Sequence, residues 1–260
     1  MPFEFYFVLF MSFILGTIIG SFLNVCIYRI PLKKSIVSPP SACPRCGQRI
    51  RWFQNIPLLS YLLLGGQCAS CRVRIPLRYP AIEFLTGILF AAVLYSFGFS
   101  LATIVYWLFI SALVVVTFID LDHRIIPDVI SLPGILAGFL LSFLIPWLPW
   151  LESLLGIFIG GGILLLIAWM YELLTKREGM GGGDIKLLAM LGAFLGWKAV
   201  LPIVFIASLA GTLVGVPALM LSKEDGKFAI PFGPFLAFAA IVYLFWGERL
   251  IGWYLALAMT

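Results

Sequence analysis

The chain has 260 residues, of which 62% are hydrophobic and only 11% charged, and its mean hydropathy is +1.10. A soluble domain carries about 25% charged residues, so this composition excludes that class and predicts a polytopic membrane protein. The net charge of +5 comes from 17 Lys and Arg against 12 Asp and Glu. The distribution of these charges carries more information than their sum.

Apolar segments of about 20 residues are the unit of a helical membrane protein. The chain contains eight, at about 4–28, 79–97, 100–120, 129–147, 151–175, 184–197, 199–221 and 231–247, followed by an apolar tail at 250–259. The sixth is short for a full crossing, which indicates a tilted or partly immersed helix. The first lacks the basic start and small-residue cleavage site of a signal peptide, so we expect it to be retained. The predicted fold is all-α, with about eight transmembrane helices.

Basic residues predict how these helices are oriented. Nine of the 17 Lys and Arg lie between Arg29 and Arg78, in one polar loop. The positive-inside rule places this loop in the cytoplasm and the N-terminus outside. Membrane lipids are expected to surround the helices. Eight alternating segments then put 15 of the 17 basic residues on the cytoplasmic side and leave Lys198 and Arg249 outside. The excess of basic residues therefore indicates how the helices are oriented in the membrane, and we expect no nucleic-acid partner.

The polar loop contains two CxxC pairs separated by the 21 residues 47–67, one residue more than the usual range. The four cysteines are Cys43, Cys46, Cys68 and Cys71. Two such turns match tetrahedral zinc, and four protein ligands indicate a structural ion. Two disulfides or four unbound thiols are the alternatives, and a cytoplasmic loop argues against stable disulfides. Cys26 is expected to be an ordinary buried residue.

These features predict three parts of the chain: a first transmembrane helix at 1–28, a cytoplasmic CxxC module at 29–79, and a transmembrane domain at 80–260. The module has little core of its own, so a metal ion would supply much of its folding energy.

Three aspartates follow the third apolar segment within nine positions. Asp120 lies closest to the hydrocarbon, and a carboxylate there is costly enough to indicate a functional site. Asp122 and Asp128 are expected to be wetted, with Asp128 in the first turn of the next helix. His123 is the sole histidine, and we expect it at the interface rather than in a catalytic role.

A glycine-rich loop, Gly179-Met180-Gly181-Gly182-Gly183-Asp184, delivers a second carboxylate to the start of the sixth segment. The predicted topology places Asp184 at the same membrane face as Asp120. Gly181 and Gly183 would support the site by letting the loop pack closely and leaving backbone N–H groups free. Lys186 would either hold the region electrostatically or anchor to lipid headgroups. The alternative for the loop is a flexible connection in which Asp184 caps a helix.

Two carboxylates in one site of low dielectric constant share a proton, because both cannot ionise cheaply. The charged member can take a proton from an attacking water, while the protonated member hydrogen-bonds the peptide carbonyl oxygen. The sequence therefore predicts an aspartic protease site in a membrane.

The motifs together resemble those of the bacterial type IV prepilin peptidases, which are GxGD aspartic proteases. The resemblance begins at Gly20-Ser21-Phe22-Leu23-Asn24-Val25 and Tyr28-Arg29-Ile30-Pro31, and the two CxxC pairs continue it. It runs on through Asn55-Ile56-Pro57-Leu58-Leu59-Ser60-Tyr61 and Arg78-Tyr79-Pro80 with Glu83. It ends at Asp120-Leu121-Asp122, Pro127-Asp128 and Gly181-Gly182-Gly183-Asp184-Ile185-Lys186.

This resemblance implies that Asp120 and Asp184 are the catalytic pair. It also implies that a basic leader is removed from type IV prepilins or pseudopilins at the cytoplasmic face of the inner membrane, in pilus assembly or type II secretion. Members with the cysteine loop resemble bifunctional enzymes that also N-methylate the new terminus using S-adenosylmethionine. Gly66 is a candidate methyltransferase residue on this resemblance alone.

Two other function classes fit part of the pattern. An ion- or proton-coupled transporter would also use buried aspartates and a glycine-broken short helix. It does not account for the CxxC loop or for two aspartates at one face. A noncatalytic assembly platform leaves Asp120 unexplained.

Overall fold

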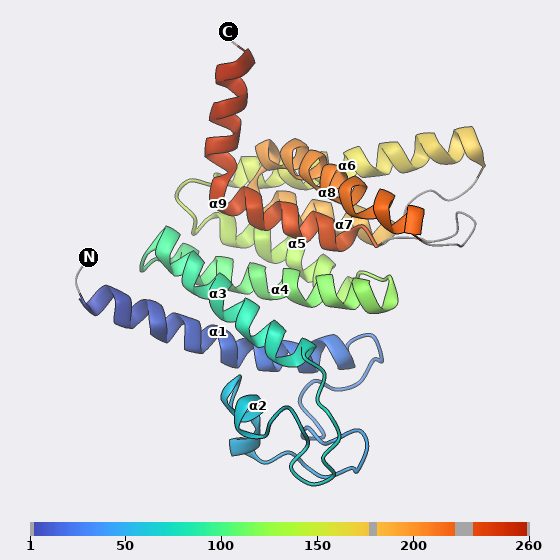
Figure 1. Cartoon of the computed structure of the whole chain (residues 1–260). Coiled ribbons are helices and arrows are strands. Elements are labelled where there is room, and N and C mark those ends of the chain that lie inside the picture. The colour runs from blue at the N-terminus through green and yellow to red at the C-terminus, as the bar shows by residue number, and fades with distance from the viewer. Residues whose placement is uncertain (1–2, 177–180, 222–230, 259–260) are drawn as a thin grey trace. The chain divides into compact units, whose positions relative to one another are not determined.

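A computed structural model of the chain describes residues 3–176, 181–221 and 231–258, and the regular structure in these ranges is helical (Figure 1). The helices are α1 (Phe3–Arg29), the 3-10 helix η1 (Trp52–Asn55), α2 (Leu59–Leu63), α3 (Arg78–Phe97), α4 (Leu101–His123), α5 (Asp128–Ser142), α6 (Trp150–Thr175), α7 (Gly182–Leu195), α8 (Trp197–Leu221) and α9 (Gly233–Ala258). The all-α prediction is confirmed.

Each of the eight predicted apolar segments corresponds to one helix. Among the described residues, six helices are long and apolar enough to cross a membrane: α1, α3, α4, α6, α8 and α9. The other two are shorter, with 15 residues in α5 and 14 in α7. The short sixth segment was expected. The apolar tail expected at 250–259 is not a separate segment, because α9 continues without a break to Ala258.

The chain forms two compact units, and the boundary between them falls inside α4, between Val115 and Val116. Unit 1 contains α1, η1, α2, α3 and most of α4. Unit 2 contains the last turns of α4 and helices α5 to α9. These units follow packing, whereas the division expected at residues 28 and 79 follows the order of membrane and loop segments.

In unit 1, α1 lies along α3 at very short range (Figure 1). A Cβ atom on Gly16 would lie 2.8 Å from the Cα atom of Gly87, and one on Gly20 would lie 2.8 Å from the Cα atom of Glu83. Small residues at such positions let helix backbones approach closely in membrane proteins. Glu83 also anchors the polar loop, because its Oε2 atom accepts a hydrogen bond from the Leu58 N–H group at 2.8 Å.

In unit 2, the short helix α7 is the central element. Every residue from Leu187 to Phe194 is buried, and α5, α6, α8 and α9 all pack against this helix. Gly156 and Gly160 on α6 allow the closest approach, since a Cβ atom on Gly160 would lie 2.6 Å from the Leu188 carbonyl oxygen. The helix that carries Asp184 is therefore held on all sides by its neighbours.

Replacing Gly192 by Ala is expected to loosen the α6–α7 contact, because the new Cβ atom would strike the carbonyl group of Gly156. Overpacking of this kind typically costs about 1–3 kcal/mol. Thermal unfolding in detergent should show a lower Tm for Gly192→Ala. Gly162→Ala on α6 is the matched control, because its Cβ atom would meet nothing within 4 Å. Equal Tm values for the two variants would contradict the close contact.

Candidate active site

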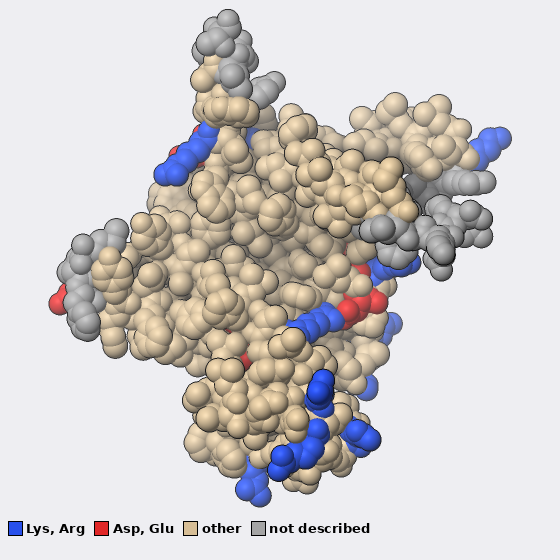
Figure 2. Space-filling view, viewed as in Figure 1, with Lys and Arg blue, Asp and Glu red and all other residues tan. Residues whose placement is uncertain are grey.

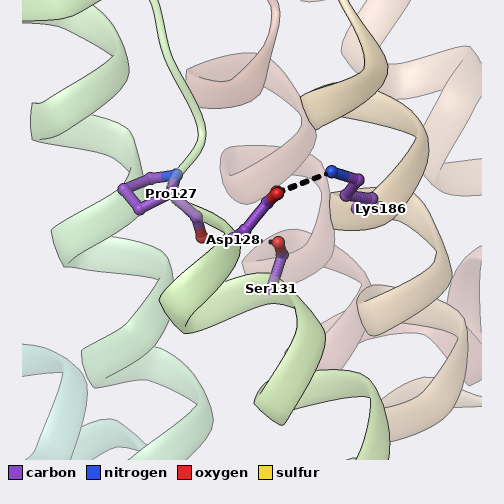
Figure 3. A network of polar contacts seen from close by, with 4 residues as sticks. All are labelled: Pro127, Asp128, Ser131 and Lys186. Carbon is purple, nitrogen blue, oxygen red and sulfur yellow. Dashed lines mark hydrogen bonds and ion pairs between the residues drawn. The ribbon is translucent and has the colours of Figure 1, made fainter.

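Ion pairs define the two ends of unit 2. The Nζ atom of Lys186 lies 2.7 Å from Oδ1 of Asp128, which places the start of α7 beside the start of α5 (Figure 3). The Nζ atom of Lys198 lies 2.8 Å from Oε1 of Glu152, which places the start of α8 beside the start of α6. Helix α6 runs antiparallel to α7, because Gly156 meets Gly192 while Gly160 meets Leu188. Helices α5 to α8 therefore alternate in direction, as the sequence predicted.

Asp120 lies in the last turn of α4 and is only 5% exposed, whereas Asp122 and Asp128 are exposed. Protein therefore shields Asp120 but not the other two aspartates, and the depth of the three in the membrane stays a prediction. The Asp120 Oδ2 atom accepts a hydrogen bond from the backbone N–H group of Gly233, at 3.0 Å. Because Gly233 begins α9, this bond brings the start of α9 to the end of α4.

Asp184 lies in the first turn of α7, three residues after the N-cap residue Gly181. Ile126 links Asp184 with Asp120. Its side chain packs against Gly183, which precedes Asp184 in the chain, and against Gly233, which hydrogen-bonds Asp120. A Cβ atom on Gly183 would lie 2.9 Å from Cβ of Ile126, and one on Gly233 would lie 3.2 Å from its Cδ1 atom. The Asp120 carboxylate is close enough to act electrostatically on Asp184. The structure thus brings the two predicted aspartates into one site.

The glycine loop divides into positions with different surroundings. Gly179 and Met180 lie outside the described residues. A Cβ atom on Gly182 would meet nothing within 4 Å, and one on Gly181 would meet only Oδ2 of Asp184, at 3.9 Å. At Gly183 the approach of Ile126 leaves no room for a side chain. Close packing, which was expected of the loop as a whole, is thus required at Gly183.

Lys186 binds Asp128, a partner that the sequence analysis did not consider for it. Its Nζ atom donates to both carboxylate oxygens of Asp128, at 2.7 and 2.8 Å (Figure 3). Asp128 lies in the first turn of α5, as expected, and the Ser131 hydroxyl donates to the Pro127 carbonyl oxygen in the same turn. The pair joins the start of α5 to the start of α7. An exposed pair of this kind contributes up to about 1 kcal/mol to stability.

The four loop cysteines form one cluster, in which all the sulfur atoms lie within 4.8 Å of one another. The Sγ atoms of Cys43 and Cys71 are 3.8 Å apart. None of the chain's five cysteines is disulfide-bonded, and Cys26 is buried in α1 as expected. The cluster can hold a metal ion.

The two CxxC turns have the same backbone geometry. Isolated antiparallel bridges close both, between Ala42 and Arg49 and between Gln67 and Arg74. In the first turn the backbone N–H groups of Cys46 and Arg45 lower the pKa of the Cys43 thiol to about 6. The corresponding groups of the second turn also lower the pKa of Cys68. The first cysteine of each turn thus favours the thiolate, the form that binds metal ions. Cys46 differs, because the Gln48 N–H group is outweighed by burial and the neighbouring cysteine sulfur atoms, which raise its pKa to about 11.

Gly66 lies in the wall of a hollow beside the second CxxC turn. The hollow has a volume of about 530 Å³, and it is lined by Tyr61, Gly65, Gly66, Gln67, Arg74, Ile75, Pro76 and Leu77. Gly66 has a φ angle of +67°, and a Cβ atom there would lie 2.8 Å from the Tyr61 hydroxyl oxygen. Both its backbone conformation and its surroundings therefore require glycine.

Gly233 and Ile126, which connect the two aspartates, were not predicted from the sequence. One signal was present at Gly233, because prolines at 231 and 234 bracket a glycine immediately before an apolar segment. That pattern indicates the start of a helix. It does not indicate which side chain the helix start will meet. Ile126 has no distinguishing signal among its apolar neighbours.

Comparison with known proteins gives consistent results along most of the chain. Residues 14–97 match the bacterial peptidase A24 N-terminal domain, and residues 107–216 match the type IV leader peptidase family. The second match contains both Asp120 and Asp184. No solved structure matches the chain.

Curated relatives are similar over most of the chain. A prepilin leader peptidase/N-methyltransferase of Pseudomonas aeruginosa is 38% identical, over 95% of this chain and 93% of its own. A protein of the same description from Neisseria gonorrhoeae is 36% identical, over 93% of both chains. One from Myxococcus xanthus is 44% identical, over 82% of this chain and 64% of its own.

Proposed function

Because the chain belongs to the type IV leader peptidase family and is a peptidase with N-methyltransferase activity, we propose that it removes the basic leader peptide from type IV prepilins or pseudopilins. Its catalytic residues are Asp120 and Asp184, which act as an aspartic dyad. It then methylates the new N-terminal residue with S-adenosylmethionine.

The observation that carries the aspartic mechanism is the convergence of one buried and one partly buried carboxylate around Ile126. In this site one carboxylate is ionised and takes a proton from water as the water oxygen attacks the scissile carbonyl carbon. The other is protonated and donates to the carbonyl oxygen. The C–N bond then breaks, and the leaving amine takes up a proton. Neither step needs a metal ion, so the loop cysteines have a separate role.

The enzyme is placed in the bacterial inner membrane, with its N-terminus outside and the polar loop and aspartates at the cytoplasmic face. Exposed Arg45, Arg49, Arg51 and Arg72 support the cytoplasmic position of the loop, and Figure 2 displays the basic side chains gathered on it. The alternation of α5 to α8 supports one common face for both aspartates. A leader held in the cytoplasm by its positive charges would meet the site there.

The metal ion is a structural Zn²⁺ held by Cys43, Cys46, Cys68 and Cys71. Zinc–sulfur bonds of about 2.3 Å in a tetrahedral site separate the sulfur atoms by about 3.8 Å, which agrees with the 3.8 Å between Cys43 and Cys71. Four thiolates favour zinc over the hard cations that prefer oxygen. All four positions are filled by protein, so the ion stabilises the loop rather than activating water.

The hollow beside Gly66 is the proposed site of S-adenosylmethionine. Its volume of about 530 Å³ lies within the range of about 300–1,000 Å³ that is typical of small-molecule sites. Gln67 and Arg74 belong both to its wall and to the bridge that closes the second CxxC turn. The cofactor would supply the methyl group. The cysteine cluster would hold in place the wall of the hollow that binds the cofactor.

Cleavage of a purified prepilin by the purified chain in detergent tests the peptidase function. We expect the prepilin to shorten by the length of its leader on a gel, and mass spectrometry should place the cut on the cytoplasmic side of the first hydrophobic segment. An intact prepilin, together with cation or proton uptake into liposomes containing the chain, would favour the transporter instead. Labelled S-adenosylmethionine added to the same reaction follows methyl transfer separately.

A further inference from the structure

The start of α9 holds one of the two aspartates directly. The backbone N–H group of Gly233 donates to Oδ2 of Asp120 at 3.0 Å, and both residues are buried. A hydrogen bond from an N–H group at the positive end of a helix favours the ionised form of a carboxylate. It also fixes which oxygen atom is occupied, so that Oδ1 of Asp120 remains for other partners.

This contact requires glycine at position 233. A Cβ atom there would lie 2.6 Å from Oδ2 of Asp120, whereas an ordinary contact begins at 3.4 Å. The φ angle of Gly233 is not in the left-handed region. Space beside the Asp120 carboxylate, rather than backbone conformation, therefore decides the residue type.

The two carboxylates differ in their surroundings. Within the part of the chain that the structure describes, a backbone N–H donor is found on Asp120 but not on Asp184. The charge of Asp120 instead acts on Asp184 electrostatically. A negative charge beside a carboxyl group favours its neutral form. The shared proton therefore belongs on Asp184 when Asp120 is held as a carboxylate.

We propose that Gly233 is a positioning residue that holds Asp120 ionised and oriented by its backbone N–H group, so that Asp120 accepts the proton from the attacking water and Asp184 carries the shared proton. This inference rests on the proposed peptidase function and adds a distinct role to each aspartate. It also assigns a function to the start of α9, which lies beyond the residues 107–216 that match the peptidase family.

Other charged groups lie near this end of unit 2. They are Asp122, His123 and Arg124 near the end of α4, Asp128 on α5, and Asp184 and Lys186 on α7. Asp128 and Lys186 pair with each other. The first turn of α9, from Gly233 to Leu236, contains no titratable side chain. Its effect on Asp120 is thus exerted through the backbone.

The test compares Gly233→Ala with Gly252→Ala in the full-length enzyme. Gly252 lies on the same helix, and a Cβ atom there would meet nothing within 4 Å. We expect Gly233→Ala to lower kcat for prepilin about 100-fold, as displaced catalytic groups do, with KM changed less than about twofold. Its activity should also rise at higher pH than that of the wild type, because the ionised form of Asp120 has lost its donor. Gly252→Ala should match the wild type in each measurement.

A second variant separates the Asp120 contact from the neighbouring contact with Ile126. Ile126→Val removes the Cδ1 atom that a Cβ atom on Gly233 would approach at 3.2 Å, and it keeps the Cβ atom that faces Gly183. The double variant Ile126→Val/Gly233→Ala should retain the 100-fold loss of kcat relative to Ile126→Val alone. Thermal unfolding in detergent should show both proteins folded at the assay temperature.

The outcomes distinguish this inference from the proposed function. If the wild type cleaves prepilin and Gly233→Ala keeps kcat within threefold with an unchanged pH profile, the positioning role is wrong while the peptidase function stands. Recovery of kcat in the double variant would also overturn it, because Ile126 would then be the group displaced. A wild type that leaves prepilin intact would overturn the peptidase function itself.

Discussion

Asp120→Asn and Asp184→Asn should each lower the rate of prepilin cleavage roughly 10³-fold or more, in line with the contribution of general acid–base catalysis. An amide at either position cannot accept the proton from water or return it to the leaving amine. The shape of the side chain is nearly unchanged, so the loss should appear in kcat while the enzyme remains folded. Initial rates of leader removal by purified variants, measured on a gel, give the comparison.

Asp122→Asn is the matched control for the dyad. Asp122 lies on the same turn of α4 as Asp120 but is exposed. Most of the cleavage activity should therefore remain. Normal processing by Asp184→Asn would refute the dyad, and an equally large loss in Asp122→Asn would show that negative charge near the end of α4, rather than the buried pair, is required.

Loss of the metal ion should abolish methyl transfer and leave leader cleavage largely intact. The cysteine cluster and the hollow beside Gly66 both lie in unit 1, whereas Asp120 and Asp184 lie in unit 2. A structural zinc ion supplies apparent folding energy of about 10–16 kcal/mol in small metal-dependent domains. We therefore expect the Cys43→Ser/Cys46→Ser variant to lose its zinc and, because the loop no longer folds, to lose methyl transfer as well.

Metal analysis and labelled methyl transfer measure the two parts of this prediction. Cys26→Ala is the control, because Cys26 is buried in α1 and lies outside the cluster. It should keep both the zinc and the methyl transfer. Carefully purified wild type without zinc would end the metal hypothesis. Full methyl transfer in the zinc-free cysteine variant would instead separate the cluster from the methyltransferase site.

Most of the helical framework could be predicted from the sequence because apolar length and charge are local properties. Each of the eight apolar segments corresponds to a helix, and the shortness of α7 was visible as a segment of only 14 residues, 184–197. The burial of Asp120 relative to Asp122 followed from its distance along an apolar run. The cysteine cluster followed from the spacing of its CxxC turns, which depends on a few neighbouring residues.

The partner of Lys186 could not be predicted in this way. Asp128 is 58 residues earlier in the chain, and only the packing of α5 beside α7 brings the two side chains together. The choice between electrostatic support and lipid contact was open because both depend on what lies opposite the helix. The close approach at Gly183 was similarly hidden, because it requires the position of Ile126.

The sequence by itself determined the class of this protein, the order of its helices, the two carboxylates and the four cysteines, since composition and short-range spacing dictate them. Only the tertiary structure decided that Gly233 meets Asp120, across 113 positions of the chain. Such a contact arises only when helices pack. A glycine has no side chain whose chemistry would indicate the contact in the sequence. The two aspartates were recognisable as a pair, but what makes them unequal lies in the backbone of a distant helix.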